Sequence, residues 1–415
     1  MNNIVQNYSY YLNKEIERQS HTISLIASEN YVSGDVLRAL GSVFTNKYAE
    51  GYPAKRYYAG NIVVDEMENW VRKLAINLFD LDSDIWMVNV QPYSGSPANL
   101  AIYLGLLNIG DKILSMKLDH GGHLTHGHKV SASGRLFDFC HYGLDEEGKI
   151  DLIELEKKLV EEKPKLVVVG SSSYPGIIDF EKIGSLVKKY QTLMLADISH
   201  ISGLMAAKVH PSCFGVADVV MTTTHKTLRG PRSALIYAKK ELMEQIDRSV
   251  FPGLQGGPHL NNILGVGVAL SEASRSEFIQ YQKQVLANAQ VLAEELKSRN
   301  INLVMGGTEN HIVLIDVSKS GIDSISVEKG LEKIGIVVNK NVIPNDKNKP
   351  FNPSGIRLGT PAVTTRGMKE QEIKKIATIV ADVIERKVND EQISQYQNEV
   401  GELTKRFPVP SLKCN

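Results

Sequence analysis

Short runs of continuously apolar residues alternate with helical patterns through the middle of this 415-residue chain, and this rhythm limits the folds open to it. Such runs predict strands that are covered on both faces, because a strand with one solvated face would alternate apolar and polar residues. The helical segment Ile183–Tyr190 lies between two of them, as in a βαβ unit. We therefore predict an α/β fold with a large, mainly parallel sheet. The expected strands are Ile85–Val90, Ile113–Met116, Leu166–Gly170, Leu193–Asp197, Val219–Thr223 and Ala234–Ala238.

The pattern changes after about residue 270. Apolar residues recur at steps of three and four from Phe278 to Leu296, which indicates a long amphipathic helix. The same pattern returns from Ile373 to Val383, and two strand-like stretches, Ile312–Val317 and Ile336–Asn339, lie between. We predict an N-terminal arm at 1–50, a large α/β domain at 51–270, and a bridging helix with a smaller C-terminal α+β domain at 271–415.

The composition argues against several classes of protein. The 47 basic and 47 acidic side chains give a net charge of zero, which offers no electrostatic attraction for nucleic acid or an anionic membrane. The chain has no run of about 18 apolar residues and begins without a signal-peptide pattern. Cys140, Cys213 and Cys414 are odd in number and widely spaced, which disfavours disulfides and structural zinc. We expect a cytoplasmic protein, and its near-zero net charge favours self-association.

The first residue that indicates chemistry is Lys226, which follows the predicted strand Val219–Thr223 and precedes Gly230. A lysine near a strand end can project into the crevice where open α/β sheets bind ligands. An exposed lysine in a turn is the alternative.

Two further segments strengthen the first interpretation. Asp197 ends a predicted buried strand, where an ionised carboxylate needs a cationic partner or a hydrogen-bond donor, and a protonated pyridine nitrogen would supply one. Capping of the next helix is the alternative for Asp197. The segment Ser94–Ser96 precedes an apolar helical stretch and can bind phosphate, although it is also ordinary turn chemistry. A phosphate cradle, a strand-end Asp and a strand-end Lys, in that order, resemble the aspartate-aminotransferase-like (fold-type I) pyridoxal phosphate enzymes.

Four histidines, at positions 120, 123, 126 and 128, raise the question of a metal site. Their spacing matches no common zinc pattern, and the glycines among them oppose a helix that would align them. We expect no metal here, and instead an imidazole stacked on a cofactor ring.

Arg357 is the candidate for binding a substrate carboxylate, because a guanidinium forms two parallel hydrogen bonds with that group. It lies among Gly, Ser and Pro residues after Phe351, which predicts a loop at the lip of a site. A surface arginine is the alternative.

Longer motifs resemble the serine hydroxymethyltransferase (glycine hydroxymethyltransferase) family, in the family's order, from about residue 10 to about 390. They are Leu25–Asn30, Thr45–Pro53, Lys55–Tyr58, Gly121–Gly127, Thr222–Leu228, Phe251–Gly253, Gln255–Pro258 and Ser354–Pro361. The resemblance implies a fold-type I transferase with pyridoxal 5′-phosphate as cofactor and tetrahydrofolate as co-substrate. It also implies a homodimer with shared active sites, acting on serine and glycine in one-carbon metabolism and amino-acid biosynthesis.

The resemblance also implies roles for individual residues around the cofactor. Lys226 would carry pyridoxal phosphate as a Schiff base, Asp197 would pair with its ring nitrogen, and His123 would stack on the ring. His200 would contact the ring hydroxyl, and Gly256 and Gly257 would bind the phosphate from a second subunit. The remaining cofactor contacts would be Ser94, Gly95, Ser96, Ser172 and His225, the last also with a catalytic role.

On the substrate side, Glu50 would be the proton-handling carboxylate, with Tyr48 and Tyr58 beside it. Arg357 would orient the substrate, and its neighbours would be Ser28, Arg232 and His200. The positions that match folate contacts are Tyr57, Leu118, Gly122, Leu124, Asn341 and Phe351.

The chain departs from the family's pattern near the cofactor. Tyr93 stands where His is usual, Pro97 replaces Gln, Ser199 replaces Ala, and Arg229 replaces a small residue. The folate-contact positions are retained, which favours a hydroxymethyltransferase. The alternatives are a folate-independent threonine aldolase or transaldolase, an α-methylserine hydroxymethyltransferase, a pyridoxal-phosphate-fold protein without turnover, and a metal hydrolase. Further departures are Ala59, Asn61-Ile62, Ser233-Ala234 and a short insertion around Ser83–Met87.

Overall fold

The computed structural model describes residues 2–348 and 351–413. The chain forms two compact units: the large unit, 35–283, and the small unit, 1–34 with 284–415. The boundary between residues 283 and 284 falls inside helix α11 (Ser276–Ser298). A compact unit need not fold independently, so the division into domains at residues 50 and 270 stays a prediction. Cys414 lies outside the described residues.

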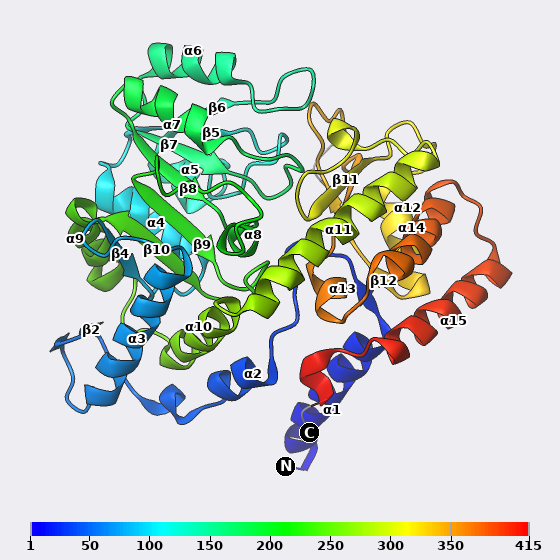
Figure 1. Ribbon diagram of the computed structural model, residues 1–415, viewed down its shortest axis with the longest axis horizontal. Helices are drawn as coiled ribbons and strands as arrows, with labels where there is room; N and C mark the ends of the chain where they lie inside the picture. Colours follow the sequence, from blue (N-terminus) through cyan, green and yellow to red (C-terminus); the bar gives the residue numbers. More distant parts are fainter. Residues whose placement is uncertain (1, 349–350, 414–415) are drawn as a thin grey trace. The chain divides into compact units, whose positions relative to one another are not determined.

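A seven-stranded sheet forms the centre of the large unit, with strand order β4-β10-β9-β8-β7-β5-β6 (Figure 1). β10 runs antiparallel to β4 and β9, and the other neighbouring pairs are parallel. The predicted mainly parallel sheet is confirmed, with one strand that the sequence did not predict, β6. The bounds are β4 Trp86–Asn89, β5 Lys112–Met116, β6 Asp138–Tyr142, β7 Leu166–Gly170, β8 Leu193–Asp197, β9 Val219–Thr223 and β10 Ala234–Lys239.

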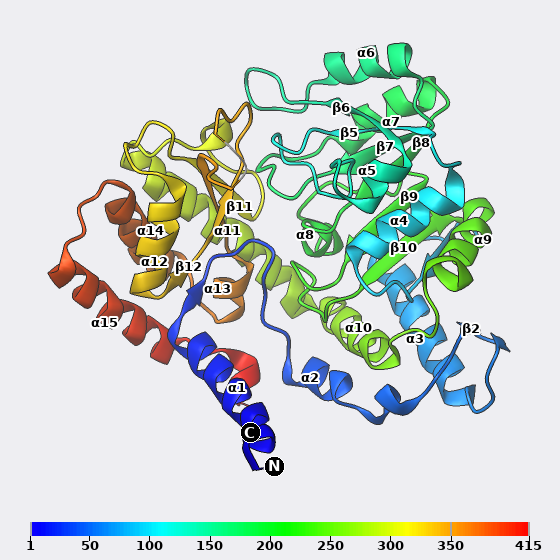
Figure 2. The ribbon, with the colours of Figure 1, turned by 180° about the vertical axis from the view of Figure 1, so that it is seen from behind.

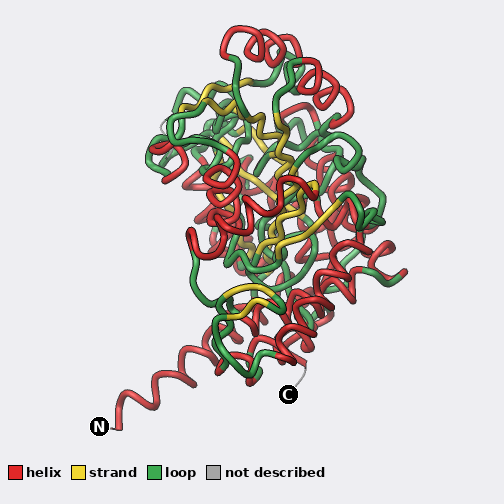
Figure 3. Tube along the Cα trace, turned by 90° about the vertical axis from the view of Figure 1, so that its left-hand side faces the viewer, coloured by secondary structure: helices red, strands yellow, loops and turns green. Residues whose placement is uncertain are grey.

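Helices lie on both sides of these strands (Figure 3). β7, for example, is buried along its whole length, which explains its unbroken apolar sequence. Because β7, β8 and β9 are parallel, their carboxyl ends meet at one edge, where Asp197 pairs in register with Gly170 and Met221. The flanking helices are α3 Ile62–Leu78, α4 Gly95–Leu106, α6 Leu152–Glu162, α7 Phe180–Lys189 and α9 Lys240–Arg248, and α10 Leu260–Ala273 packs against α3.

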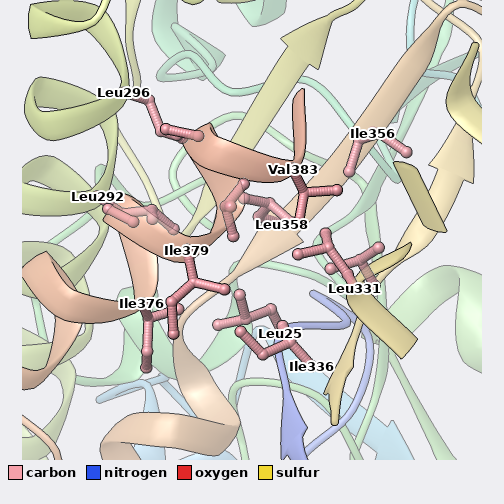
Figure 4. Close-up of a cluster of buried hydrophobic side chains, with 14 of the residues drawn as sticks. Leu25, Leu292, Leu296, Leu331, Ile336, Ile356, Leu358, Ile376, Ile379 and Val383 are labelled. Atoms are coloured by element: carbon pink, nitrogen blue, oxygen red, sulfur yellow. The ribbon is translucent and has the colours of Figure 1, made fainter. Parts of the chain in front are cut away.

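The small unit contains a three-stranded antiparallel sheet in the order β11-β14-β13. Leu292, Leu331, Ile356 and Ile376 meet in its apolar core, where full burial of each such side chain contributes about 1.5–3 kcal/mol (Figure 4). The two predicted helices appear as α11 and α14. The bounds are β11 Ile312–Asp316, α12 Ser324–Ile334, β12 Ile336–Val337, β13 Asn339–Asn341, β14 Gly355–Gly359, α14 Glu370–Ile384 and α15 Asp390–Arg406.

The first residues of the chain belong to the small unit. α1 (Asn2–His21) lies beside α15, which ends near the C-terminus (Figure 2). The short strand β1 (Ile23–Ser24) then pairs in parallel with β12, and Leu25 is fully buried in the same core. None of the described helices is both long and apolar enough to cross a bilayer.

Candidate active site

Lys226 lies in the loop after β9, close to the carboxyl edge of the large sheet. Its Nζ atom donates a hydrogen bond to Oγ1 of Thr223, the last residue of β9, at 2.7 Å. The loop closes on itself where the N–H of Gly230 donates to the carbonyl of Thr224 at 2.7 Å. Lys226 is half-buried and held at the strand end, unlike an exposed lysine in a turn.

Asp197 ends β8, the neighbouring strand, with only 7% of its surface exposed. Its carboxylate accepts hydrogen bonds from Asn99 Nδ2 at 3.0 Å, His126 Nε2 at 3.1 Å and the N–H of Ser199 at 3.1 Å. Burial by itself raises the pKa of this carboxyl, but His126 and Ser199 bind the anion, and the net pKa lies well below its ordinary value. The helix-cap alternative fails, because the next helix has Ile201 as its N-cap.

Three of the four histidines have different hydrogen-bond partners. His126 binds Asp197, whereas Nδ1 of His120 accepts from the N–H of Leu144 at 2.8 Å. The Nδ1 atom of His123 lies 2.8 Å from the hydroxyl of Thr125, which leaves the role as a ring-stacking residue a prediction. Across the residues described, no three His, Cys, Asp or Glu side chains gather closely enough to hold a metal.

The predicted phosphate cradle is the start of α4, with Ser94 as its N-cap residue. Ser94 makes no side-chain cap bond, and Ser96 is exposed in the first turn. A Cβ added at Gly95 would lie 2.7 Å from Cγ2 of Thr223, so glycine is required and the helix start touches the strand before Lys226. Free N–H groups and the helix dipole at such a start attract anions.

Ser172, His200 and His225 also belong to the large unit. The Ser172 N–H donates to the carbonyl of Gly121 at 2.7 Å, next to the histidine loop, and His200 is buried after β8. Among the described atoms, Nδ1 of His225 is buried without a hydrogen-bond partner. Burial, reinforced by the charges of Lys226 and Arg232, lowers the pKa of His225 to about 3, so the imidazole is neutral at physiological pH.

These groups fit pyridoxal phosphate, feature by feature. The start of α4 can bind the phosphate, the anionic Asp197 can pair with a protonated ring nitrogen, and the amine of Lys226 can bind the aldehyde carbon. The unsatisfied nitrogen of His225 is a further polar atom that a ligand could satisfy.

Glu50 belongs to a second cluster of expected residues in the large unit. A Cβ added at Gly256 would lie 3.1 Å from Oε1 of Glu50, and one at Gly257 would lie 3.2 Å from the ring of Tyr48. Tyr48 meets Tyr58 edge-to-face with 5.0 Å between ring centroids. The structure therefore brings these five expected residues together, and Tyr48 is 54% exposed within the chain.

The folate-contact positions are spread over several segments. Tyr57 is 74% exposed and lies near Phe251, with 5.6 Å between ring centroids. Gly122 leaves no room for a side chain, because a Cβ there would lie 2.4 Å from the carbonyl oxygen of Met116. Leu118 lies four residues before Gly122 in the chain. Leu124 lines a cavity of about 470 Å³ that reaches the first turn of α4. Asn341, in β13, and the exposed Phe351 belong to the small unit.

Arg357 lies in the small unit, and the prediction of a loop there is wrong. It occupies β14, the central strand of the sheet, and is 8% exposed. Its Nε donates to Oδ1 of Asn339 at 3.2 Å and its Nη2 to the hydroxyl of Ser28 at 3.4 Å. Burial lowers the pKa of Arg357 to about 10, which still leaves the guanidinium charged at neutral pH.

Comparison with known proteins agrees with this arrangement. The profile described as serine hydroxymethyltransferase matches residues 3–380. The chain belongs to the serine hydroxymethyltransferase family. A protein named serine hydroxymethyltransferase from Desulfotalea psychrophila is 48% identical over 402 residues, covering 97% of this chain and 94% of its own. One of the same name from Acidothermus cellulolyticus is 48% identical over 405 residues, covering 96% and 94%.

Membership of the serine hydroxymethyltransferase family confirms a fold-type I enzyme that depends on pyridoxal phosphate and uses tetrahydrofolate as co-substrate. His126 and Asn99 are functional candidates that the sequence reasoning missed. His126 stands in the Gly121–Gly127 motif, where its spacing raises only the question of a metal ligand. Asn99 lies four residues after Gly95 on α4, a spacing that places both on one side of a helix.

Two departures from the serine hydroxymethyltransferase pattern have structural partners. The hydroxyl of Ser199 accepts from the N–H of Thr223 at 3.1 Å, which links the ends of β8 and β9. Arg229 has a positive φ of 59° and pairs with Glu272 at 3.6 Å. Pro97, in the first turn of α4, occupies a position where a helix tolerates proline.

Proposed function

We propose that this chain catalyses the reversible transfer of the hydroxymethyl group of serine to tetrahydrofolate, giving glycine and 5,10-methylenetetrahydrofolate. The observation that carries the proposal is the Asp197 carboxylate, buried and ionised at the edge where Lys226 and the start of α4 also lie. Pyridoxal phosphate, when bound, acts as an electron sink for bonds at the amino acid's Cα. The comparisons support this activity and not the specialised alternatives.

The residues of the large unit hold and tune the cofactor in this proposal. Asp197 keeps its negative charge because His126 and Asn99 donate to it, and so favours a protonated ring nitrogen. Thr223 holds the amine of Lys226 at the strand end. His225 stays neutral, so it adds no positive charge beside the lysine.

Glu50 handles the proton of the substrate hydroxyl, with Tyr48 and Tyr58 beside it. The closeness of Glu50 to Gly256 supports a single functional cluster. In this proposal the glycine pair of that cluster binds phosphate. We propose that this cluster serves the active site of a second copy of the chain in a homodimer. Tyr48 and Tyr57 are exposed within one chain, which supports their burial in an interface between two copies of the chain.

Arg357 binds the substrate carboxylate. Its buried guanidinium has lost most of its hydration, so a bidentate carboxylate would stabilise it. The hydroxyl of Ser28 accepts a hydrogen bond from Arg357, and Arg232 and His200 complete the proposed substrate contacts. Folate would contact Tyr57, Leu118, Gly122, Leu124, Asn341 and Phe351.

A cytoplasmic location is part of the proposal. Cys140 and Cys213 are free thiols, which supports a reducing compartment. The balanced charge supports small-molecule substrates and a second copy of the chain as the partners, not nucleic acid or membrane.

Titration of the cofactor-loaded protein with glycine, followed by absorbance, tests the proposed function. We expect a long-wavelength band that grows sharply when tetrahydrofolate is added, because glycine and folate then occupy one site. The same titration with Lys226→Ala is the control for signals from free cofactor. A glycine signal that ignores folate would contradict the proposal and direct attention to threonine with a panel of aldehydes.

A further inference from the structure

Tyr93, which stands where the family usually has His, makes three contacts with one distant segment. Its N–H donates to Oε1 of Gln255 at 3.0 Å, and its hydroxyl donates to the carbonyl of Gly257 at 2.8 Å. Its ring stacks on that of His259, with 4.0 Å between centroids and 5° between planes. One side chain and its backbone therefore hold residues 255–259 at three points.

The segment so held contains the glycine pair that lies against Glu50. A Cβ at Gly256 would lie 3.1 Å from Oε1 of Glu50 and 3.7 Å from the hydroxyl of Tyr48. Partial burial and the proximity of Tyr48 and Glu50 raise the pKa of the Tyr93 phenol, which places Tyr93 in the same electrostatic environment. A shift in the glycine pair would therefore also shift the surroundings of the carboxylate.

Tyr93 also has a covalent link to the phosphate cradle, because the next residue is Ser94, the N-cap of α4. A further hydrogen bond joins the same two segments two residues before Tyr93, where Nε2 of Gln255 donates to the carbonyl of Gln91 at 2.9 Å. The start of α4 and the glycine pair are thus joined through residues 91–93.

We propose that Tyr93 is a positioning residue, which fixes the Gly256–Gly257 pair and the neighbouring Glu50 carboxylate relative to the start of α4. The inference rests on the proposed function for the roles of Glu50 and the glycines. It also gives a physical reason for tyrosine in place of the family's usual histidine. A phenol stays a neutral donor throughout the physiological pH range, whereas an imidazole changes charge near pH 6.5.

Tyr93→Phe tests the inference, because it keeps the stacked ring and removes only the hydroxyl that binds Gly257. We expect the apoprotein to bind pyridoxal phosphate about two- to tenfold more weakly, the effect of one neutral hydrogen bond. Tyr190→Phe is the matched control, since it removes a tyrosine hydroxyl that binds Glu156 at 2.9 Å, on a segment without expected site residues. Cofactor affinity equal to wild type in Tyr93→Phe would overturn the inference, as would an equal loss in both variants.

Tyr93→His supplies a second readout. We expect its cofactor affinity to depend more strongly on pH between 5.5 and 8 than that of Tyr93→Phe, because the two variants share the neighbouring imidazole of His259 and differ only in the titratable ring at position 93. Identical pH profiles for the two variants would count against positioning by a neutral donor. Cofactor binding needs neither serine nor folate, so these outcomes are separate from a failure of the proposed reaction.

Discussion

The Nε2 atom of His126 lies 3.1 Å from Oδ2 of Asp197, and both side chains are buried. The pair joins the loop after β5 to the end of β8. Since a buried carboxylate without partners would take up a proton, this contact is one physical reason why Asp197 remains an anion.

His126→Leu should make the protein more sensitive to acid. The folded-state pKa of Asp197 lies below its ordinary value, so the stability it contributes is complete above about pH 4 and is lost as the pH falls through the folded pKa. Removing His126 raises that pKa, and we expect the acid-unfolding midpoint to move to higher pH. At neutral pH the free energy of unfolding should fall by about 1–3 kcal/mol. His21→Leu, at an exposed histidine, should leave the midpoint in place.

Lys226→Ala should abolish the visible absorbance band of the lysine-bound cofactor, because no amine remains at the end of β9. Lys189→Ala is the control, since Lys189 is exposed and binds Glu156 at 2.7 Å. The measurement is the visible absorbance spectrum of each variant, recorded after addition of pyridoxal phosphate and removal of the excess. A band that survives in Lys226→Ala would assign the cofactor to another lysine.

His225→Asn should flatten the pH dependence of stability on the acid side. The pKa of His225 is about 3 when folded and about 6.5 when unfolded, so the unfolded chain binds more protons between these values. Stability from this residue therefore rises with pH from about 3 to 6.5 and is constant above. Urea unfolding at a series of pH values measures the slope, and an unchanged slope in the variant would contradict the neutral state of His225.

Arg357→Ala should raise the KM for serine about ten- to a hundredfold, because a carboxylate loses its charge-assisted hydrogen bonds. Arg357→Lys should recover only part of the loss, since an ammonium cannot form the two parallel bonds. Arg248→Ala, at an exposed arginine paired with Glu244, serves as the control. Steady-state kinetics at saturating folate provide the measurement, and an unchanged KM would place the carboxylate elsewhere.

Much of the large sheet could be predicted, because its strands are apolar without interruption. β6 could not, since its residues, Asp138–Tyr142, mix exposed polar and partly buried positions at the sheet edge, where β5 is its neighbour in the sheet order. For β14 the sequence predicts a loop because Gly, Ser and Pro surround Arg357, yet pairing with β11 and β13 on both sides overrides that local preference.

The chemistry was predictable where it depends on position along a strand, as for Asp197 and Lys226. The partners of Asp197 were not, because Asn99 and His126 lie 98 and 71 residues away in the chain. One sequence shows no relation between positions so far apart. The folded sheet creates it by bringing α4 and the histidine loop to one strand end.

The pairing of β1 with β12 has a consequence for synthesis. Ile23 leaves the ribosome early, but Ile336, its partner, follows more than three hundred residues later. At about 5–20 residues per second, the interval is roughly 15 to 60 seconds. Throughout that time the apolar segment around Leu25 has no native core to enter, so the nascent chain must keep it from non-native association until the last third of the protein has been made.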